Sequence, residues 1–212
     1  MSAGGRLVTI EGGEGAGKST VMAAVQAALA ATGREVVATR EPGGTPAAEA
    51  IRALMLSPEH ALVPEAELLL AFAARAQHVR ERVLPALARG AIVLSDRFTD
   101  ASFAYQGGGR GIDAARIAEL ERWAAGVRPD LTLLLDVGVG EGLARARGRG
   151  GAPDRIEREQ ETFFERVRAT YLARAAAEPA RFRVIDAGLP QAEVVAAVEA
   201  QVRAWLEAQA WT

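Results

Sequence analysis

Short runs of hydrophobic residues alternate along the chain with longer segments of helical periodicity. Five runs have the length of strands buried in a sheet, at residues 6–10, 35–39, 91–95, 131–137 and 182–186. The longer segments are predicted helices, at residues 21–32, 47–56, 64–88, 113–125, 157–178 and 191–210. This alternation predicts a single α/β domain over residues 1–212, with helices on both faces of a five-stranded parallel sheet.

Several residues mark the ends of the predicted helices. Pro64 suits a first helical turn and Asp113 suits an N-cap, whereas Gly33 and Gly126 suit helix ends. Pro85 lies inside the 64–88 segment, and we expect it to kink the end of that helix.

A charged residue lies at or just after the end of each predicted strand. These residues are Glu11, Arg40, Asp96, Asp136 and Asp186. Because ligands of parallel sheets bind beyond the carboxyl ends of the strands, we expect these side chains to ring one cleft. Asp136 could instead cap the helix that follows it, and the sequence leaves both possibilities open.

A glycine-rich loop joins the first predicted strand to the first predicted helix. It has the pattern GxxxxGK[ST], formed by Gly12, Gly13, Glu14, Gly15, Ala16, Gly17, Lys18 and Ser19 and followed by Thr20. In such a loop, backbone N–H groups and the lysine hold nucleotide phosphates, and the Ser19 hydroxyl can ligate the accompanying Mg²⁺. The chain is therefore expected to bind a nucleoside triphosphate.

The composition supports this loop and argues against several other kinds of site. Lys18 is the only lysine among 25 basic residues, and a compact ammonium suits a phosphate loop better than a guanidinium does. The chain has no cysteine, and His60 and His78 are isolated, which argues against a disulfide framework or a zinc site. A net charge of −2 and 5% aromatic residues give little support to nucleic-acid binding.

The sequence shows neither a signal-like N-terminus nor an apolar run of the roughly 20 residues that span a membrane. We therefore expect a cytoplasmic protein that does not enter the membrane.

Two other classes of phosphate-loop protein fit the sequence poorly. The NKxD motif with which GTPase switches read guanine needs a second lysine, which the chain lacks. Motor ATPases usually carry consecutive acidic residues after a hydrophobic strand, whereas the 131–137 run offers only Asp136. A kinase is the favoured interpretation.

Residues after the loop have the chemistry of a second substrate site. Arg97 follows the third predicted strand and could clamp an acceptor phosphate with its forked donors, while Asp96 could hold Mg²⁺ through water. Phe72 and Arg75 share a helix face and could present a ring for base stacking beside a donor. The alternative places Phe72 in the core and Arg75 on the surface.

An arginine-rich segment at residues 145–151 could supply further positive charge. Residues 13–16 of the phosphate loop carry no cation, so an additional arginine for phosphoryl transfer must come from elsewhere. Glycines surround the arginines of this segment, as a flexible lid at about residues 145–157 would require. We expect Arg149 to be catalytic, with Arg147 and Arg155 as alternatives, although the segment could also be an ordinary solvated basic loop.

Several strings of the sequence resemble those of one family. They are REPGGT at residues 40–45, FAAR at 72–75, DRF at 96–98, AYQGGGRG at 104–111 and DRIE at 154–157, together with Glu11 and the phosphate loop. In combination they resemble bacterial thymidylate kinases. This resemblance implies a three-layer α/β/α fold of the P-loop NTPase type and a homodimer. It also implies transfer of the γ-phosphoryl group of MgATP to dTMP, giving dTDP and ADP.

The resemblance also implies roles for individual residues. Phe72 would stack on thymine, Arg75 would read its O4, Ser102 would contact its N3, and Tyr105 would crowd the sugar 2′ position in favour of deoxyribose. Gln106 lies four residues after Ser102 and could face the same pocket.

At the strand ends, Glu11 and Arg40 would position the acceptor sugar and phosphate. The 186–190 loop is the expected place for adenine. The phosphate loop has no cation at residues 13–16 and the lid segment has several arginines, which matches the subclass of the family whose catalytic arginine lies in the lid. Phe98 departs from the family, which more often has histidine or tyrosine there. A kinase for another acceptor and a nucleotide-binding regulator without catalysis remain alternatives.

Overall fold

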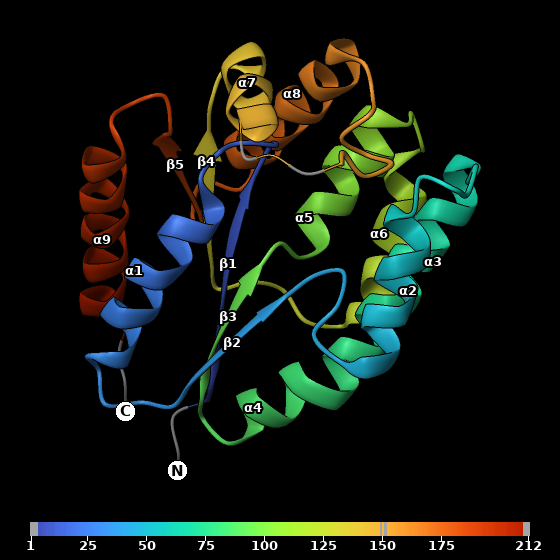
Figure 1. The fold of residues 1–212 in the computed structure, drawn as a ribbon. Helices are drawn as coiled ribbons and strands as arrows, with labels where there is room; N and C mark the ends of the chain where they lie inside the picture. The colour runs from blue at the N-terminus through green and yellow to red at the C-terminus, as the bar shows by residue number, and fades with distance from the viewer. Residues whose placement is uncertain (1–3, 149, 151, 210–212) are drawn as a thin grey trace.

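The computed structural model describes residues 4–148, 150 and 152–209. Five parallel strands form one sheet in the order β2-β3-β1-β4-β5 (Figure 1). The strands are β1 (Arg6–Gly12), β2 (Val36–Arg40), β3 (Ile92–Asp96), β4 (Leu131–Asp136) and β5 (Phe182–Asp186). The five predicted strands are thus confirmed, with boundaries that shift by no more than about two residues.

Helices cover both faces of the sheet. Helices α1 (Lys18–Ala30) and α9 (Gln191–Ala208) pack on one face, and α8 (Glu161–Ala177) packs on the other. Residues Leu133 and Leu135 of β4 lie in the core beneath α1 and α9, whereas Leu134 lies in the core beneath α8. Because successive side chains of a strand point to opposite faces, the uninterrupted hydrophobic run of β4 serves both cores.

The remaining helical segments lie along the chain between β2 and α8. They are α2 (Pro46–Leu56), α3 (Pro64–His78), η1 (Val79–Val83), α4 (Leu84–Ala88), α5 (Thr99–Ser102), η2 (Phe103–Gly109), α6 (Ala114–Leu120), η3 (Glu121–Ala125) and α7 (Val139–Gly148). Helices α2, α3 and α6 form a group to one side of the sheet (Figure 1). None of the helices in the described part of the chain is long and apolar enough to cross a membrane.

The predicted helix-end signals at two positions have the expected geometry. The Asp113 carboxylate accepts a hydrogen bond from the Ala115 N–H at 2.8 Å, so Asp113 caps α6. Gly126 ends η3 in the left-handed conformation, with φ 64°. The 64–88 segment is helical throughout, but residues 79–83 form a π-helical turn that ends two residues before Pro85. Pro85 has no N–H to donate.

Two helices were not predicted, and one begins later than expected. Helix α7 contains three glycines, which lower its helix propensity and hide it in the sequence. Arg145 and Arg147 therefore lie in the last turn of a helix and not among the hinges of a lid. Helix α5 is only one turn long. Helix α8 begins at residue 161 because Asp154 organises a turn before it, accepting from the N–H groups of Ile156 and Glu157.

Candidate active site

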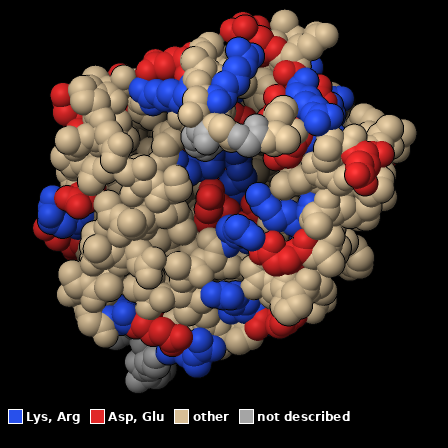
Figure 2. Space-filling view, in the orientation of Figure 1, with Lys and Arg blue, Asp and Glu red and all other residues tan. Residues whose placement is uncertain are grey.

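A cleft of about 310 Å³ opens beyond the carboxyl ends of β1 and β3. Its wall includes phosphate-loop residues 14–19, Asp96 and Arg97 after β3, and Tyr105 and Gln106 of η2. Figure 2 shows basic and acidic side chains gathered in a hollow near the centre of this face. After β1 the chain crosses to β2 and β3, which lie on one side of β1 in the sheet. The cleft lies at this crossing, which is the position at which parallel sheets bind ligands.

The phosphate loop ends in the N-terminus of α1. Gly17 precedes the helix in the left-handed conformation, and the Lys18 ammonium folds back over the loop. Its Nζ donates to the carbonyl oxygens of Gly13 at 2.9 Å and Gly12 at 3.2 Å. Burial lowers the pKa of Lys18 to about 8, and the neighbouring charge of Arg97 acts in the same direction. A phosphate group beside this ammonium would favour its charged form.

Glycine at position 15 is required by the packing of the loop. Its φ is +69°, and a Cβ there would lie 1.9 Å from the carbonyl oxygen of Gly142. The backbones of the phosphate loop and α7 therefore touch without an intervening side chain. Through this contact, α7 supports the loop from the side that faces away from β3.

Arg97 stands at the centre of the cleft. Its backbone has φ 68°, which is uncommon for a residue with a Cβ and concentrates at functional sites. Nη1 donates to Gly12 O at 2.9 Å, and Nη2 donates to Glu14 Oε1 at 3.1 Å. The Tyr105 and Tyr171 hydroxyls accept from the same guanidinium at 3.0 and 3.2 Å. A forked cation is thus held beside the phosphate loop by groups from three parts of the fold.

Asp96 and Ser19 lie on the cleft wall, as the sequence predicts for metal ligands. The Oδ1 atom of Asp96 is buried and has no hydrogen-bond partner among the described residues. A buried carboxylate oxygen without a partner is costly, and a cation or its bound water would satisfy it. Oxygen donors of this kind suit Mg²⁺.

Arg75 is buried, with 3% of its surface exposed, and still lines the cleft. Its three nitrogen atoms donate to Glu41 Oε2 at 2.6 Å, Ser102 Oγ at 3.0 Å and the Phe98 carbonyl oxygen at 3.1 Å. The alternative with Arg75 on the surface is therefore wrong. The Phe72 ring lies under the guanidinium, 4.5 Å away, but packs in the core and does not reach the cleft wall.

Glu11 lies beneath the cleft and not on its wall. Its oxygens accept from the Phe98 N–H and the Tyr171 hydroxyl, each at 2.7 Å, and none of the residue is exposed. Burial raises the pKa of Glu11 to about 8, and the charge of Asp100 adds to this effect. The expected contact of Glu11 with an acceptor is therefore replaced by support of the Arg97–Phe98 turn from behind.

The other charged residues at strand ends do not gather in the cleft. Arg40 is exposed and forms a two-point ion pair with Glu49, at 2.9 and 3.2 Å. Both oxygens of Asp136 accept from Arg168 of α8, so Asp136 neither lines this cleft nor caps α7. Asp186 accepts from the Gly188 N–H in its own loop. The expectation that these five side chains ring one cleft is wrong, because the cleft opens beyond the ends of β1 and β3 only.

The lid residues differ in where they lie. Arg147 is exposed in the last turn of α7, and Arg149 lies outside the described residues. Arg155 donates from Nε to the Met55 carbonyl oxygen at 2.8 Å, and its Nη1 lies 2.8 Å from Glu67 Oε2. Arg155 is therefore engaged by protein groups and does not line the cleft, which leaves Arg149 and Arg147 as candidates.

A second cavity, of about 500 Å³, opens on the other side of the phosphate loop. Its wall combines loop residues 15–17 and Thr20 with residues 187–191 after β5. Arg145 of α7 also lines it and donates to the Ala187 carbonyl oxygen at 2.7 Å. The loop expected to contact adenine thus lies directly beside the phosphate loop.

Some residues that line the cleft or contact its residues were not predicted individually. Arg52 of α2 lines the cleft and donates to the Pro42 carbonyl oxygen at 2.9 Å, although nothing in its local sequence distinguishes it. Glu41 belongs to the REPGGT string, and its place beside Arg40 could have drawn attention to it. Tyr171 comes from α8, far along the chain, and no local pattern links it to Glu11 or Arg97.

Comparison with known proteins identifies close relatives. The family model for thymidylate kinase matches residues 10–198. A thymidylate kinase of Chromohalobacter salexigens is 58% identical over 201 residues, covering 93% of this chain and 95% of the relative. One from Pseudomonas savastanoi pv. phaseolicola is 55% identical over 205 residues, covering 96% and 97%. The crystal structure of thymidylate kinase from Ehrlichia chaffeensis superimposes with a TM-score of 0.75 at 32% identity, covering 96% of this chain and 99% of that one.

Proposed function

This chain belongs to the thymidylate kinase family, and from this premise we propose how its two cavities divide the reaction. The enzyme transfers the γ-phosphoryl group of ATP to dTMP, giving dTDP and ADP. We propose that dTMP occupies the cleft between the phosphate loop and η2. The adenine of ATP would then occupy the second cavity, with its phosphates on the loop between the two.

The observation that carries this assignment is the position of Lys18, Ser19 and Arg97 on one cleft wall. A donor phosphate held by the loop and an acceptor phosphate held by Arg97 would lie next to each other. Direct in-line transfer needs positioning and positive charge and forms no covalent intermediate with the protein.

In the acceptor cleft, Arg97 would bind the phosphate of dTMP. Arg75 would read the base together with Ser102 and Gln106. Arg75 is suited to this because Glu41 and Phe98 already fix its orientation. Tyr105 lies between the two regions, since its hydroxyl contacts both Arg97 and Glu14. It would therefore lie against the sugar and disfavour a 2′-hydroxyl.

Mg²⁺ is the metal that the donor set fits. Ser19 would ligate it directly and Asp96 would hold it through water, which would satisfy the buried Asp96 Oδ1. When bound, Mg²⁺ neutralises charge on the phosphate oxygens of ATP. Lys18 supplies further charge from the protein, and Arg149 or Arg147 would complete it from the segment after α7, as in the lid-arginine subclass.

The enzyme is also proposed to act as a homodimer in the cytoplasm, without a nucleic-acid or membrane partner. The support for a dimer is an apolar face formed by α3, α6 and η3. Trp123 on this face is 80% exposed and Leu69 is 58% exposed, which is unusual for a monomer surface.

Acceptor profiling tests the proposed division of the site. Purified enzyme would be given MgATP with dTMP, dUMP, UMP, CMP, AMP or GMP, and ADP formation would be measured. We expect turnover largely confined to dTMP, and Lys18→Ala should abolish it while leaving the circular dichroism spectrum unchanged. Comparable turnover of another acceptor would contradict the proposed base site, and near-normal activity of Lys18→Ala would contradict the role of the loop.

A further inference from the structure

Glu67 is a fully buried carboxylate on α3 that does not itself line the cleft. Its Oε1 accepts from Gln106 Nε2 at 2.8 Å. Its Oε2 accepts from Arg110 Nε at 3.1 Å and lies 2.9 Å from Arg110 Nη2 and 2.8 Å from Arg155 Nη1. One buried carboxylate therefore gathers an amide and two guanidinium groups.

The partners of Glu67 come from segments that are distant in sequence. Gln106 belongs to η2, and Arg110 follows η2 directly. Arg155 belongs to the turn at residues 153–160 that leads into α8. The same turn is fixed from a second side, because the Arg155 N–H donates to the Leu56 carbonyl oxygen at 3.0 Å and its side chain donates to Met55 O.

Arg110 strengthens the connection between η2 and the turn. Its Nη1 donates to Glu159 Oε1 at 2.6 Å, and its guanidinium lies 4.7 Å from the centre of the Phe163 ring. Arg110 thus links Glu67 with both the end of the turn and the start of α8. The contacts form a closed network around a carboxylate that water does not reach.

Both segments held by Glu67 form part of the cleft wall. Gln106 lines the cleft from η2, whereas Asp154, Ile156 and Glu157 line it from the turn. Because η2 is a short π-helical segment and the turn is irregular, contacts with other elements help to hold both walls in place. A group that holds both walls at once can set the width of the cleft.

We propose that Glu67 is a positioning residue for dTMP binding, which fixes η2 and the 153–160 turn in the register that the acceptor requires. The inference rests on the proposed acceptor site. The role is more than structural, because the positions of the two cleft walls, and not of the sheet, depend on the Glu67 carboxylate. The first residues after the arginine-rich segment would also be anchored by it.

The physical test is removal of the negative charge at nearly constant shape. In Glu67→Gln, an amide N–H₂ group would face guanidinium donors, and Arg110 and Arg155 would be left partly uncompensated in a buried place. We expect KM for dTMP to rise about tenfold or more and KM for ATP to change less than about twofold. Amide hydrogen exchange at residues 153–160 should accelerate about tenfold or more relative to β1 and β4.

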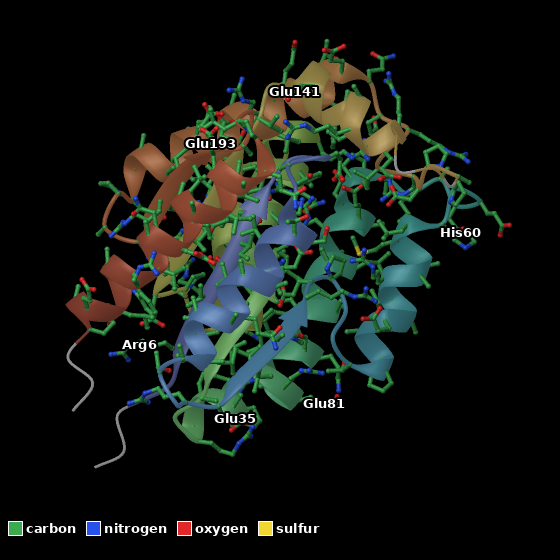
Figure 3. The ribbon with its side chains drawn as sticks, turned by 60° about the vertical axis from the view of Figure 1, so that its left-hand side comes forward. Arg6, Glu35, His60, Glu81, Glu141 and Glu193 are labelled. Carbon is green, nitrogen blue, oxygen red and sulfur yellow. The ribbon has the colours of Figure 1, made fainter. Side chains whose placement is uncertain are left out.

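Two comparisons make the test specific. Glu193→Gln removes a carboxylate from the first turn of α9, at the outer surface and away from α3 (Figure 3), and should change none of these quantities. Glu67→Asp keeps the charge and should recover part of the dTMP affinity. If Glu67→Gln does not fold, Arg155→Met removes the contact from the turn side and should give the same local exchange and the same selective change in KM.

An unchanged KM for dTMP in Glu67→Gln would overturn the inference. This holds whether amide hydrogen exchange at residues 153–160 stays slow or accelerates uniformly with the rest of the chain. Equal weakening of dTMP and ATP binding would also overturn it. The exchange measurement needs no substrate, so it tests the inference separately. Failure of the wild-type enzyme to turn over dTMP would instead contradict the proposed function.

Discussion

At the scale of single residues, the backbone of Arg97 explains how its side chain reaches the phosphate loop. The Arg97 N–H donates to Ile10 O of β1 at 2.9 Å, which holds the residue at the end of the sheet. From there, the left-handed conformation, with φ 68°, turns the chain so that the guanidinium crosses to Gly12 and Glu14. Such a conformation persists only where the surroundings impose it, and here β1 and Glu11 do so.

Replacing Arg97 with lysine tests whether the forked geometry is needed. Lysine keeps the charge but offers a single ammonium, which cannot bind two phosphate oxygens in the plane of a guanidinium. We expect Arg97→Lys to lower kcat/KM for dTMP about 10²-fold, with KM for ATP little changed. Arg89→Lys is the control, because Arg89 pairs with Glu35 at the exposed end of the sheet, and it should leave the kinetics unaltered. Near-normal kcat/KM in Arg97→Lys would show that charge alone suffices.

Glu11 gives the protein a distinctive pH dependence. Its pKa is about 8 in the folded protein, mainly through burial, and 4.5 is its ordinary value. Between these values the folded state binds the proton more tightly than the unfolded state does. The free energy of unfolding should therefore fall as pH rises from about 4.5 to about 8, by up to ~1.4 kcal/mol per pH unit from this group.

The Glu11→Gln variant isolates that contribution. An amide does not titrate, so the difference between wild-type and variant unfolding free energies should decline across this pH window. Denaturant titrations at pH 5, 6, 7 and 8 would measure it, with Glu59→Gln in an exposed loop as the control. A difference that stays constant from pH 5 to 8 would mean that Glu11 is already ionised in the folded protein.

Residue types in the cleft were easier to predict than their contacts. The family resemblance implies that Arg75 and Ser102 both contact thymine, and the structure joins them at 3.0 Å. Arg40 belongs to an equally specific string and faces Glu49 instead. Which side chain each arginine pairs with depends on the packing of α2, α3 and α5, which no local pattern expresses.

At the scale of elements, η2 owes its position to glycines that let it approach α8. A Cβ on Gly108 would lie 2.0 Å from Thr170 Oγ1 and 2.8 Å from the Arg166 carbonyl oxygen. Arg166 in turn donates to the carbonyl oxygens of Gly108 and Gly109, at 3.2 and 2.8 Å. The contact brings Tyr105 of η2 against Tyr171 of α8, with ring centres 6.3 Å apart.

Adding one methyl group at this contact should separate the two elements. The Gly108→Ala methyl would meet backbone, so we expect a loss of about 1–3 kcal/mol in the free energy of unfolding and a raised KM for dTMP. Gly107→Ala is the matched control, because its methyl would lie 3.2 Å from the end of the Ile117 side chain and at an ordinary 3.8 Å from the Ile112 carbonyl oxygen. Chemical denaturation of both variants measures the effect, and equal stabilities would contradict the packing argument.

Single substitutions can distinguish the roles of Arg147 and Arg149 at and after the end of α7. If the segment after this helix closes over ATP, an arginine there would stabilise charge that develops only during transfer. We expect Arg149→Ala to lower kcat about 10²-fold or more with little change in dTMP affinity. Arg147→Ala, on the exposed last turn of α7, should have a much smaller effect. Single-turnover kinetics would compare the two, and the reverse ranking would assign the role to Arg147.

Helices were predicted well where an amphipathic pattern or a cap marks them, as for α6 with Asp113 and Gly126. The π-helical turns η1, η2 and η3 could not be predicted, because they arise from tertiary contacts and not from local propensity. The same holds for the 153–160 turn. Its anchor is the contact of Arg155 with Glu67 of α3, which lies nearly ninety positions earlier in the chain.

At the scale of the whole molecule, the parallel sheet with helices on both faces followed from the alternation of hydrophobic runs. The phosphate loop marked the end of the first strand, and the structure places this strand at the centre of the sheet, where β1 pairs with β3 and β4. The order of the outer strands and the side-chain networks joining α3, η2 and α8 required the structure. The reaction was therefore predictable, whereas the groups that hold its substrates in place were only partly so.

The exposed face on α3, α6 and η3 leads to a prediction about assembly. Leu69 and Trp123 are exposed at 58% and 80%, and the neighbouring wall includes Leu68, Ile112 and Leu120. Burying such a face against its copy would remove apolar area from water, and large aromatic residues usually contribute most at such interfaces. We expect the protein to be a dimer at micromolar concentration and Trp123→Glu to weaken the dimer about 10²-fold or more.

Sedimentation velocity over a concentration series would measure this change. Val184→Glu is the control, because Val184 is a half-exposed hydrophobic residue on the edge strand β5, remote from the proposed face. A dimer in both wild type and Val184→Glu, with monomer in Trp123→Glu, would locate the interface on this face. Monomeric wild type would contradict the dimer itself, whereas a Trp123→Glu dimer would move the interface elsewhere. Since η2 and α3 carry cleft residues and adjoin this face, monomeric Trp123→Glu should also bind dTMP more weakly.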